Sequence, residues 1–258
     1  MTLNHNIVQN TIRHKELCFE LYDTISSTNT VLKQRGRNGA PHGLVLASTH
    51  QTEGRGRMGR QFYSPAETGI YFSLLLRPQL KPEDCLLITT AAAVAVTRVL
   101  DRYIDHAAKI KWVNDIYVNN KKVCGILTEA AIHGNGYLDF AVLGIGINIT
   151  QPHDGFPTEL SNIAGSLFLT QKENIRELIM TEVLDTFMDL YETLDSKAHI
   201  SEYRSRSMLD GMDINVLKSD SIIPAKALNI DEELRLVVQY SDGSIEHLHT
   251  GDVSIRRI

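Results

Sequence analysis

Residues 108–149 constrain the fold of this chain most strongly, because three β-rich segments follow one another there with two short turn signals between them. The first break is Asn119-Asn120, and the second is the run from His133 to Gly136. Asn and Gly suit tight turns because they tolerate positive φ, so the segments are expected to form consecutive antiparallel strands. The pattern therefore predicts an antiparallel meander.

The segments before and after the meander predict both helices and strands. Short buried or half-buried strands are expected at 17–22, 43–49 and 70–76. A helix is expected to begin near Ser27 and to run toward Gln34. Pro82 opens a longer helix through Tyr103, and Thr170–Glu173 has the spacing of a capping box ahead of another apolar helical stripe.

The helical period ends at about residue 206, and short alternating segments broken by Asp242-Gly243 and Gly251-Asp252 follow. Such a pattern fits a small β-barrel. We therefore expect an α+β chain with a domain at 1–206, in which helices cover a mixed or antiparallel sheet, and a β-barrel domain at 207–258.

Composition excludes several classes of protein. The chain has 258 residues, of which 43% are hydrophobic, so it can bury a substantial core. A formal net charge of −5 argues against a general nucleic-acid surface. Three widely spaced cysteines lack metal-ligand spacing and suit reduced thiols, and no apolar run is long enough for a membrane span. A soluble, unprocessed, cytoplasmic protein is expected.

Positive charge is concentrated in the loop 51–60, where GRGRMGR places three arginines and three glycines in seven residues. Glycine lets backbone N–H groups approach an anion, while Arg55, Arg57 and Arg60 each offer a planar fork of donors. The pattern favours a phosphate-binding loop, and a solvated basic loop is the alternative.

Three further clusters are candidates for a site. Ser27-Thr28-Asn29 can offer hydroxyls to a ligand from a helix N-terminus, or can simply cap the helix. Lys111 and Lys122 are expected on the two arms of one hairpin, where a solvated lysine is the alternative for each.

Glycines inside strands form the third cluster. Gly125, Gly144 and Gly146 lie in strand patterns, where glycine usually marks a bulge or the close approach of another group. The chain has neither a nucleophile elbow nor the P-loop motif. What remains suits activation of a carboxylate by a nucleotide, because cations would offset the repulsion between two anions.

Four motifs in order carry a family resemblance: STN, GRGRMGR, KWVND with KKVCGIL, and GIGIN. From about residue 17 to the C-terminus the chain resembles the biotin protein ligases. This resemblance implies an α+β catalytic domain followed by an SH3-like barrel. It also implies an AMP-forming reaction in which ATP and Mg²⁺ convert biotin to biotinyl-5′-AMP, before biotin passes to one lysine of a carboxyl carrier domain such as that of acetyl-CoA carboxylase.

The resemblance also implies the site residues. Expected biotin contacts are Ser27, Thr28, Asn29, Gln51, Arg55, Gly56, Arg57, Tyr71, Lys122 and Gly125. Expected nucleotide contacts are Arg55, Arg57, Arg60, Phe62, Lys111, Asn114 and Asn148. Lys122 would meet the carboxylate and the α-phosphate, and Arg57 would latch the loop over them. Asp115 would bind magnesium or orient the site.

Two positions depart from the family pattern: Val113 replaces a frequent proline, and Phe62 stands where some members place tryptophan beside adenine. Only about two dozen residues precede the STN helix, so we expect no DNA-binding domain. A lipoate–protein ligase is the nearest alternative enzyme, and a noncatalytic RNA-binding or carrier-binding module is the alternative outside enzymes. The oligomeric state, including a homodimer, stays open.

Overall fold

The fold is described from a computed structural model, which covers residues 3–134, 136–218, 221–249 and 254–257. Its centre is a mixed sheet of seven strands in the order β1-β2-β3-β7-β6-β5-β4. The strands are β1 Cys18–Tyr22, β2 Leu44–Ser48, β3 Gly69–Leu76, β4 Lys109–Lys111, β5 Asp115–Val118, β6 Lys121–Ile132 and β7 Leu138–Asn148. β1 and β2 pair in parallel, and the other neighbours pair antiparallel.

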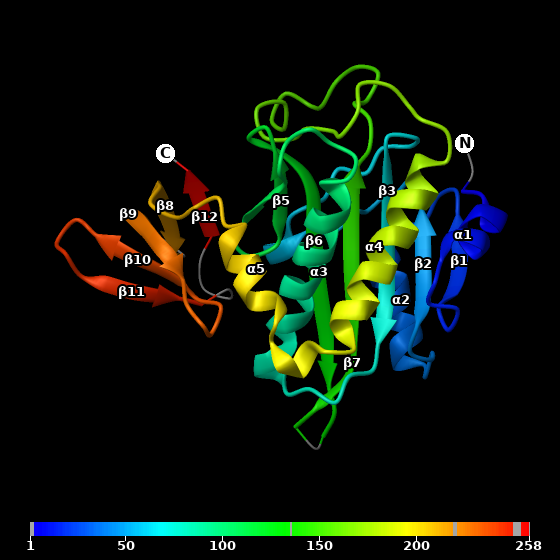
Figure 1. Cartoon of the computed structure of the whole chain (residues 1–258), viewed down its shortest axis with the longest axis horizontal. Helices are drawn as coiled ribbons and strands as arrows, with labels where there is room; N and C mark the ends of the chain where they lie inside the picture. The colour runs from blue at the N-terminus through cyan, green and yellow to red at the C-terminus, as the bar shows by residue number, and fades with distance from the viewer. Residues whose placement is uncertain (1–2, 135, 219–220, 250–253, 258) are drawn as a thin grey trace.

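Helices cover both faces of this sheet (Figure 1). The helices are α1 His5–Thr11, α2 Thr28–Arg37, α3 Cys85–Leu100, α4 Ile175–Tyr191 and α5 His199–Ser205. In Figure 1, α3 and α4 cross the near face, and α2 lies behind the sheet. α3 is buried almost all round because α4 and α5 pack against it, which explains its continuous run of apolar residues.

Side chains of β7 point alternately to the two faces of the sheet, so they pack in two separate layers. Ala141, Leu143 and Ile145 belong to the large core under α3 and α4. Phe140 and Val142 point to the other face, where they pack in a smaller cluster with Leu32 of α2. Further along that second face come Gly144 and Gly146, which carry no side chain and leave room there for Asn29 and Phe62.

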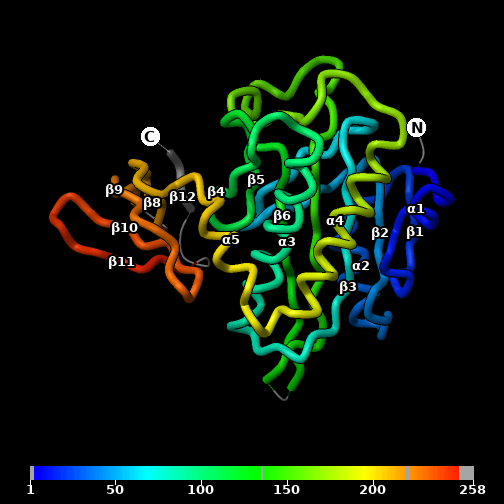
Figure 2. The backbone as a smooth tube through the Cα atoms, in the orientation of Figure 1, coloured from blue at the N-terminus to red at the C-terminus, as the bar shows by residue number. Residues whose placement is uncertain are grey.

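A second sheet of five strands follows, in the order β11-β10-β9-β8-β12. Its strands are β8 Asp213–Lys218, β9 Ser221–Ile230, β10 Leu236–Tyr240, β11 Ile245–Leu248 and β12 Ser254–Arg257, all paired antiparallel. Figure 2 shows this sheet at one side of the molecule and the loop 149–174 over one end of the main sheet.

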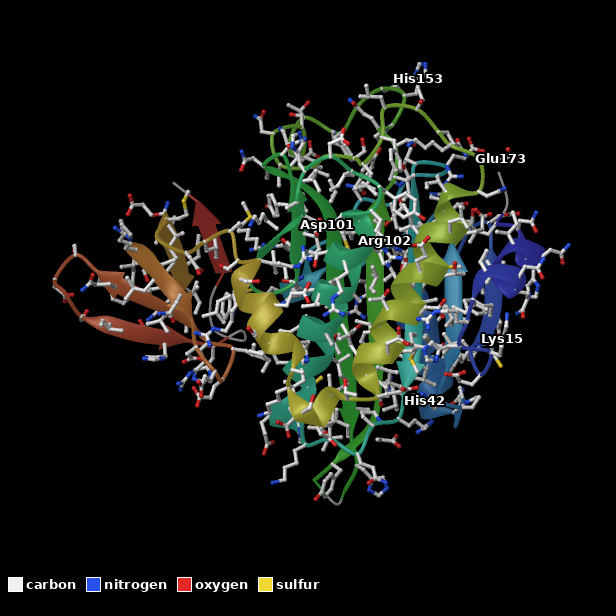
Figure 3. The ribbon with its side chains drawn as sticks, in the orientation of Figure 1. Lys15, His42, Asp101, Arg102, His153 and Glu173 are labelled. Atoms are coloured by element: carbon white, nitrogen blue, oxygen red, sulfur yellow. The ribbon has the colours of Figure 1, made fainter. Side chains whose placement is uncertain are left out.

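A hydrogen bond joins the second sheet to the turn after β4, and an ion pair holds the end of α5, which leads into that sheet, against the end of α3. Trp112 Nε1 donates to the carbonyl of Leu234, between β9 and β10, at 2.9 Å. Asp101, labelled in Figure 3 at the end of α3, accepts from Arg206 at 2.7 Å just before the second sheet begins. Apolar side chains of both sheets also belong to one continuous core.

The structure confirms the α+β class and the antiparallel meander, and it corrects several local predictions. The interval 108–149 holds four strands instead of three, because the short β4 precedes β5. α3 ends at Leu100, before Tyr103. The capping-box prediction at Thr170–Glu173 is wrong, since α4 begins at Ile175 and its N-cap, Asn174, makes no side-chain cap bond.

Two more corrections concern strand positions. β9 was not anticipated, and its Pro224 sits in a paired strand. Lys111 and Lys122 lie on β4 and β6, with β5 between them, so they are not the two arms of one hairpin. Within the expected β-barrel domain at 207–258, residues 219–220, 250–253 and 258 lie outside the described residues. No helix in the described part is long and apolar enough to span a membrane.

Candidate active site

The α2 face of the sheet carries a row of residues that spans four antiparallel pairings. In this row Tyr71 of β3 pairs with Gly146, Gly146 with Gly125, Gly125 with Asp115, and Asp115 with Lys111. The register therefore brings residues from five strands, far apart in sequence, into line. Glycines at the middle of the row leave a depression between polar ends.

Strand glycines make room for side chains of the chain itself. A Cβ on Gly146 would lie 2.6 Å from the ring of Phe62, and a Cβ on Gly125 would lie 2.9 Å from it. Gly144 likewise leaves room for the Asn29 amide. The prediction of a close approach at these glycines is therefore confirmed, with Phe62 and Asn29 as the approaching groups.

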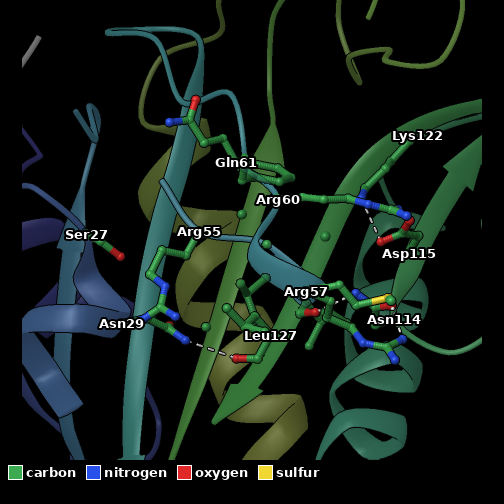
Figure 4. Close-up of a pocket in the computed structure, with 18 of the residues that line it drawn as sticks. Ser27, Asn29, Arg55, Arg57, Arg60, Gln61, Asn114, Asp115, Lys122 and Leu127 are labelled. Atoms are coloured by element: carbon green, nitrogen blue, oxygen red, sulfur yellow. Dashed lines mark hydrogen bonds and ion pairs between the residues drawn. The ribbon is translucent and has the colours of Figure 1, made fainter. Parts of the chain in front are cut away.

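The N-terminus of α2 forms one wall of the resulting cavity. Ser27 is the N-cap, and its Oγ accepts from Thr30 N at 3.4 Å, so the capping interpretation holds for this residue. Thr28 N–H donates to Gln51 Oε1 at 2.9 Å. Ser73 Oγ donates to Asn29 Oδ1 at 2.6 Å, which ties the helix to β3. Ser27, Thr28 and Asn29 are almost fully buried and line a small cavity, in which Figure 4 labels Ser27 and Asn29.

The basic loop closes over this cavity as a compact hairpin. Phe62 N–H donates to Gly54 O at 2.9 Å, and Gly56 N–H donates to Arg60 O at 2.7 Å. Met58 adopts a positive φ of 55° at the tip, and its side chain is exposed. The hairpin turns its arginines toward the cavity in different directions, as Figure 4 shows.

Each of two loop arginines contacts a polar group on the sheet. Arg57 Nη1 donates to Asn114 Oδ1 at 3.1 Å. Burial lowers the pKa of Arg57, and the Asp115 carboxylate works against this shift; the guanidinium nevertheless stays charged at neutral pH. Arg55 lies 3.4 Å from a carboxylate oxygen of Glu129.

A second cavity adjoins the first. The loop 149–174 supplies Phe156, Leu160, Ile163 and Ala164 to its lining, and Asn148 and Tyr117 complete part of the sheet side. The two cavities share a wall made of Arg60, Gln61, Phe62, Lys111, Asp115 and Lys122. Three cations thus stand where a ligand in one cavity would meet a ligand in the other.

Lys122 and Asp115 form the tightest ion pair of this shared wall, at 2.7 Å. Both side chains are about three-quarters buried, and Lys122 Nζ also lies 5.7 Å above the centre of the Phe62 ring. The described residues contain no cluster of three or more His, Cys, Asp or Glu side chains able to hold a metal. Magnesium usually needs only one or two carboxylates when phosphates supply further oxygens, so Asp115 fits such an ion.

Most predicted site residues converge on these cavities. The first is lined by Ser27, Thr28, Asn29, Gln51, Arg55, Gly56, Arg57, Arg60, Phe62, Lys111, Asn114, Asp115, Lys122 and Gly125. Asn148 lines the second, where its Nδ2 donates to Gly165 O at 2.9 Å. Tyr71 instead lies behind Phe62, in an edge-to-face contact with ring centroids 6.3 Å apart. Burial raises its pKa.

Sequence reasoning missed several residues of the site. Ser73 was visible as a lone polar residue in an apolar strand, and Glu129 as a carboxylate within a β-rich segment. Phe156 and Leu160 come from a loop without periodicity, so no pattern could indicate that they wall a cavity.

The site and fold can now be compared with known proteins. The biotin/lipoate A/B protein ligase family matches residues 21–148. The bifunctional ligase/repressor BirA of Bacillus spizizenii is 33% identical over 237 residues, which cover 90% of this chain and 72% of that protein. The biotin–acetyl-CoA-carboxylase ligase of Mycobacterium tuberculosis is 30% identical over 236 residues, with 86% of each chain covered.

A solved structure gives the same result. The biotin protein ligase from Aquifex aeolicus in complex with biotin and ATP aligns with a TM-score of 0.76 and 25% identity, over 94% of this chain and 99% of that one. Fold and site therefore define an acid-activating ligase of the biotin/lipoate class. Within that class, the chain belongs to the biotin protein ligase family, as its motifs predicted.

Proposed function

We propose that the chain joins biotin to ATP in the two adjoining cavities and then passes biotin to a lysine of a carboxyl carrier domain. The observation that carries this proposal is the shared wall, in which Lys111, Lys122 and Arg60 face both cavities. A reaction between two anions needs such a place, because cations offset their mutual repulsion and the charge that develops on the phosphate oxygens.

Biotin occupies the first cavity in this proposal. Its cyclic urea is polar and uncharged, and it would face the hydroxyl and amide groups of Ser27, Thr28, Asn29 and Gln51. Its valerate chain would run over the glycine floor toward Lys122 and Gly125. Gly56 and Arg55 would cover it from the loop, while Tyr71 would act indirectly by supporting Phe62.

ATP occupies the second cavity. Phe62, Tyr63 and Phe156 supply aromatic and apolar surface for a base, and Asn148 supplies an amide. The phosphates would be bound by Arg60 and Lys111, and by Arg57, which Asn114 holds. Attack of the biotin carboxylate on the α-phosphorus forms biotinyl-5′-AMP and expels pyrophosphate, with Lys122 beside the new charge.

Magnesium would be held by Asp115 together with phosphate oxygens, and would supply charge neutralisation when bound. In the second half-reaction the amine of a carrier lysine attacks the activated carbonyl, and AMP leaves. A carrier domain of acetyl-CoA carboxylase is the proposed acceptor, because the Mycobacterium tuberculosis relative is named for that substrate.

Isotope exchange between pyrophosphate and ATP tests the first half-reaction. We expect exchange that depends on biotin and is at least about tenfold slower with lipoate, since the loop and the polar α2 wall suit a cyclic urea. Faster exchange with lipoate would assign the chain to the other branch of the class. No exchange with either acid, from folded protein, would exclude an acid-activating enzyme.

A further inference from the structure

Glu129 lies behind the wall of the first cavity, where it contacts two lining residues, Asn29 and Arg55, and neither the sequence motifs nor the proposed reaction explains it. It lies on β6, and its side chain is only 13% exposed. Its partners come from three separate segments: Lys33 and Asn29 from α2, and Arg55 from the basic loop.

The two carboxylate oxygens of Glu129 have different partners. Oε2 accepts from Asn29 Nδ2 at 3.2 Å. Oε1 accepts from Lys33 Nζ at 2.8 Å and lies 3.4 Å from Arg55 Nη1. Burial by itself raises the pKa of Glu129, but the hydrogen bonds from Lys33 and Asn29 outweigh burial and hold the pKa below its ordinary value. The carboxylate is therefore ionised at neutral pH.

This arrangement fixes which way the Asn29 amide points. Its Nδ2 donates to Leu127 O at 3.3 Å as well as to Glu129, and both of these groups can only accept. Its Oδ1 must then face Ser73 Oγ, which donates at 2.6 Å. Figure 4 shows Asn29 with Arg55 beside it and the bond to Leu127.

We propose that Glu129 is a positioning residue for biotin: one oxygen orients Asn29, and the other ties α2 and Arg55 to the sheet. Lys33 follows Asn29 by one helical turn, so both reach Glu129 from the same face of α2. The inference rests on the proposed function, because it takes the first cavity, which Asn29 lines, as the biotin site and not as the nucleotide site.

Glu129→Gln tests the idea with almost no change of shape. A carboxylate accepts hydrogen bonds through both oxygens, whereas an amide accepts through one and donates through its nitrogen. The variant must therefore oppose either Asn29 Nδ2 or Lys33 with its own NH₂ group. We expect KM for biotin to rise roughly 10- to 100-fold, while kcat at saturating biotin and KM for ATP stay within about threefold.

Glu20→Gln is the matched control. Glu20 of β1 accepts a hydrogen bond from Arg35 of α2 at 2.7 Å, away from the cavity. This variant therefore also loses an ion pair to α2, but it does not touch the cavity wall. We expect its KM for biotin to equal that of the wild type. If Glu129 has a merely structural role, Glu129→Gln will lower the thermal midpoint of unfolding and leave KM for biotin unchanged.

A double-mutant cycle with Asn29→Ala asks whether Glu129 acts through Asn29. We expect Glu129→Gln to change KM for biotin at least about fivefold less in the Asn29→Ala background than in the wild type. Ser73→Ala, which removes the donor to Asn29 Oδ1, is the second probe if Glu129→Gln does not fold, and it should raise KM for biotin about three- to tenfold.

The outcomes separate this inference from the proposed function. A wild-type protein without biotin-dependent pyrophosphate exchange contradicts the proposed function itself. An active wild type, with KM for biotin within twofold in both Glu129→Gln and Ser73→Ala, overturns only the positioning role. Independent effects of Glu129→Gln and Asn29→Ala would likewise overturn it.

Discussion

Lys122 stands between two environments that favour its charge. Asp115 lies 2.7 Å away, and the face of the Phe62 ring attracts the ammonium from 5.7 Å. Lys122 also lines both cavities, so a ligand in either cavity would meet Nζ beside the Asp115 carboxylate. The site therefore holds a cation and its counter-ion together.

Removal of this cation should affect chemistry far more than folding. We expect Lys122→Met to lower biotin-dependent pyrophosphate release by on the order of 10²–10³-fold at saturating substrates, because charge stabilisation is lost where charge develops. Lys121→Met is the control, since Lys121 Nζ donates only to Ser161 O on an exposed surface among the contacts described. A Lys122→Met enzyme within about threefold of wild type would contradict a role for Lys122 in the chemistry.

The 51–60 loop is one element that contributes to the lining of both cavities. Its hairpin bonds are local, Thr52 and Glu53 donate from the backbone to the carbonyls of Ile25 and Ser26, and two of its side chains reach further: Arg55 toward Glu129 and Arg57 toward Asn114. Three glycines allow many backbone conformations, so we expect the loop to be mobile before ligand binds and to close over the adenylate. Protection of the loop from protease by biotin plus ATP would measure this closure.

Arg57→Gly should loosen the closed loop. It removes the fork that reaches Asn114 and stands toward phosphate, so we expect biotinyl-5′-AMP to escape and to acylate lysines of bystander proteins. Mass spectrometry of added albumin measures the leak. Met58→Gly is the matched control, because it gives the exposed loop tip similar freedom and keeps every guanidinium. Equal labelling by Arg57→Gly and wild type would contradict the latch.

α5 contributes a buried histidine that links stability to pH. His199 Nε2 is 3.0 Å from Thr90 Oγ1 of α3, and burial lowers the pKa of His199 to about 4. Unfolded histidine titrates near 6.5, so protons favour the unfolded chain below that pH. This contribution to stability is complete above about pH 6.5 and is lost as the pH falls toward 4.

We expect the free energy of unfolding, measured with urea, to fall between pH 7 and pH 4.5. His199 should account for on the order of 2 kcal/mol of this decrease. His199→Gln keeps a donor and acceptor near Thr90 without titrating, so it should remove this part of the pH dependence and leave that of the carboxylates. Parallel stability curves for the two proteins would show that His199 is not responsible.

Regular elements could be predicted from sequence because their signals are local. β3 was found from its apolar run, and the Asn119-Asn120 turn from residues that tolerate positive φ, as both do here. The start of α4 was misplaced because Asn174 takes a left-handed conformation that no capping pattern signals. Phe156 joined the site through tertiary packing alone, and Glu129 became informative only once its partners on α2 and the loop were known.

For the whole molecule, the second sheet is part of the same packed body as the first. Trp112, next to Lys111 of the shared wall, donates to Leu234, and one apolar core extends across the junction. Arg57 and Leu234 also line a common cleft between the sheets. The division into domains at 1–206 and 207–258 stays a prediction, because a shared core allows the two parts to unfold together.

Deletion of 207–258 tests what the second sheet contributes. We expect a truncated protein that retains its circular dichroism spectrum to bind biotin within about tenfold of wild type, since the described residues lining the first cavity all precede 207. Its KM for ATP or its rate of transfer to the carrier should suffer more. Calorimetric titration measures the first quantity, and complete loss of biotin binding by folded protein would contradict this division.

The intact mass of an acetyl-CoA carboxylase carrier domain measures whether this protein is a biotin protein ligase. After incubation with the protein, biotin and ATP, we expect one added biotinyl group, absent without ATP and absent from a carrier whose acceptor lysine is replaced by arginine. Lys122→Met should leave the carrier almost unmodified, and Lys121→Met should modify it as the wild type does. An unmodified carrier, in the presence of folded wild-type protein and both substrates, would contradict the claim that these cavities form a biotin protein ligase.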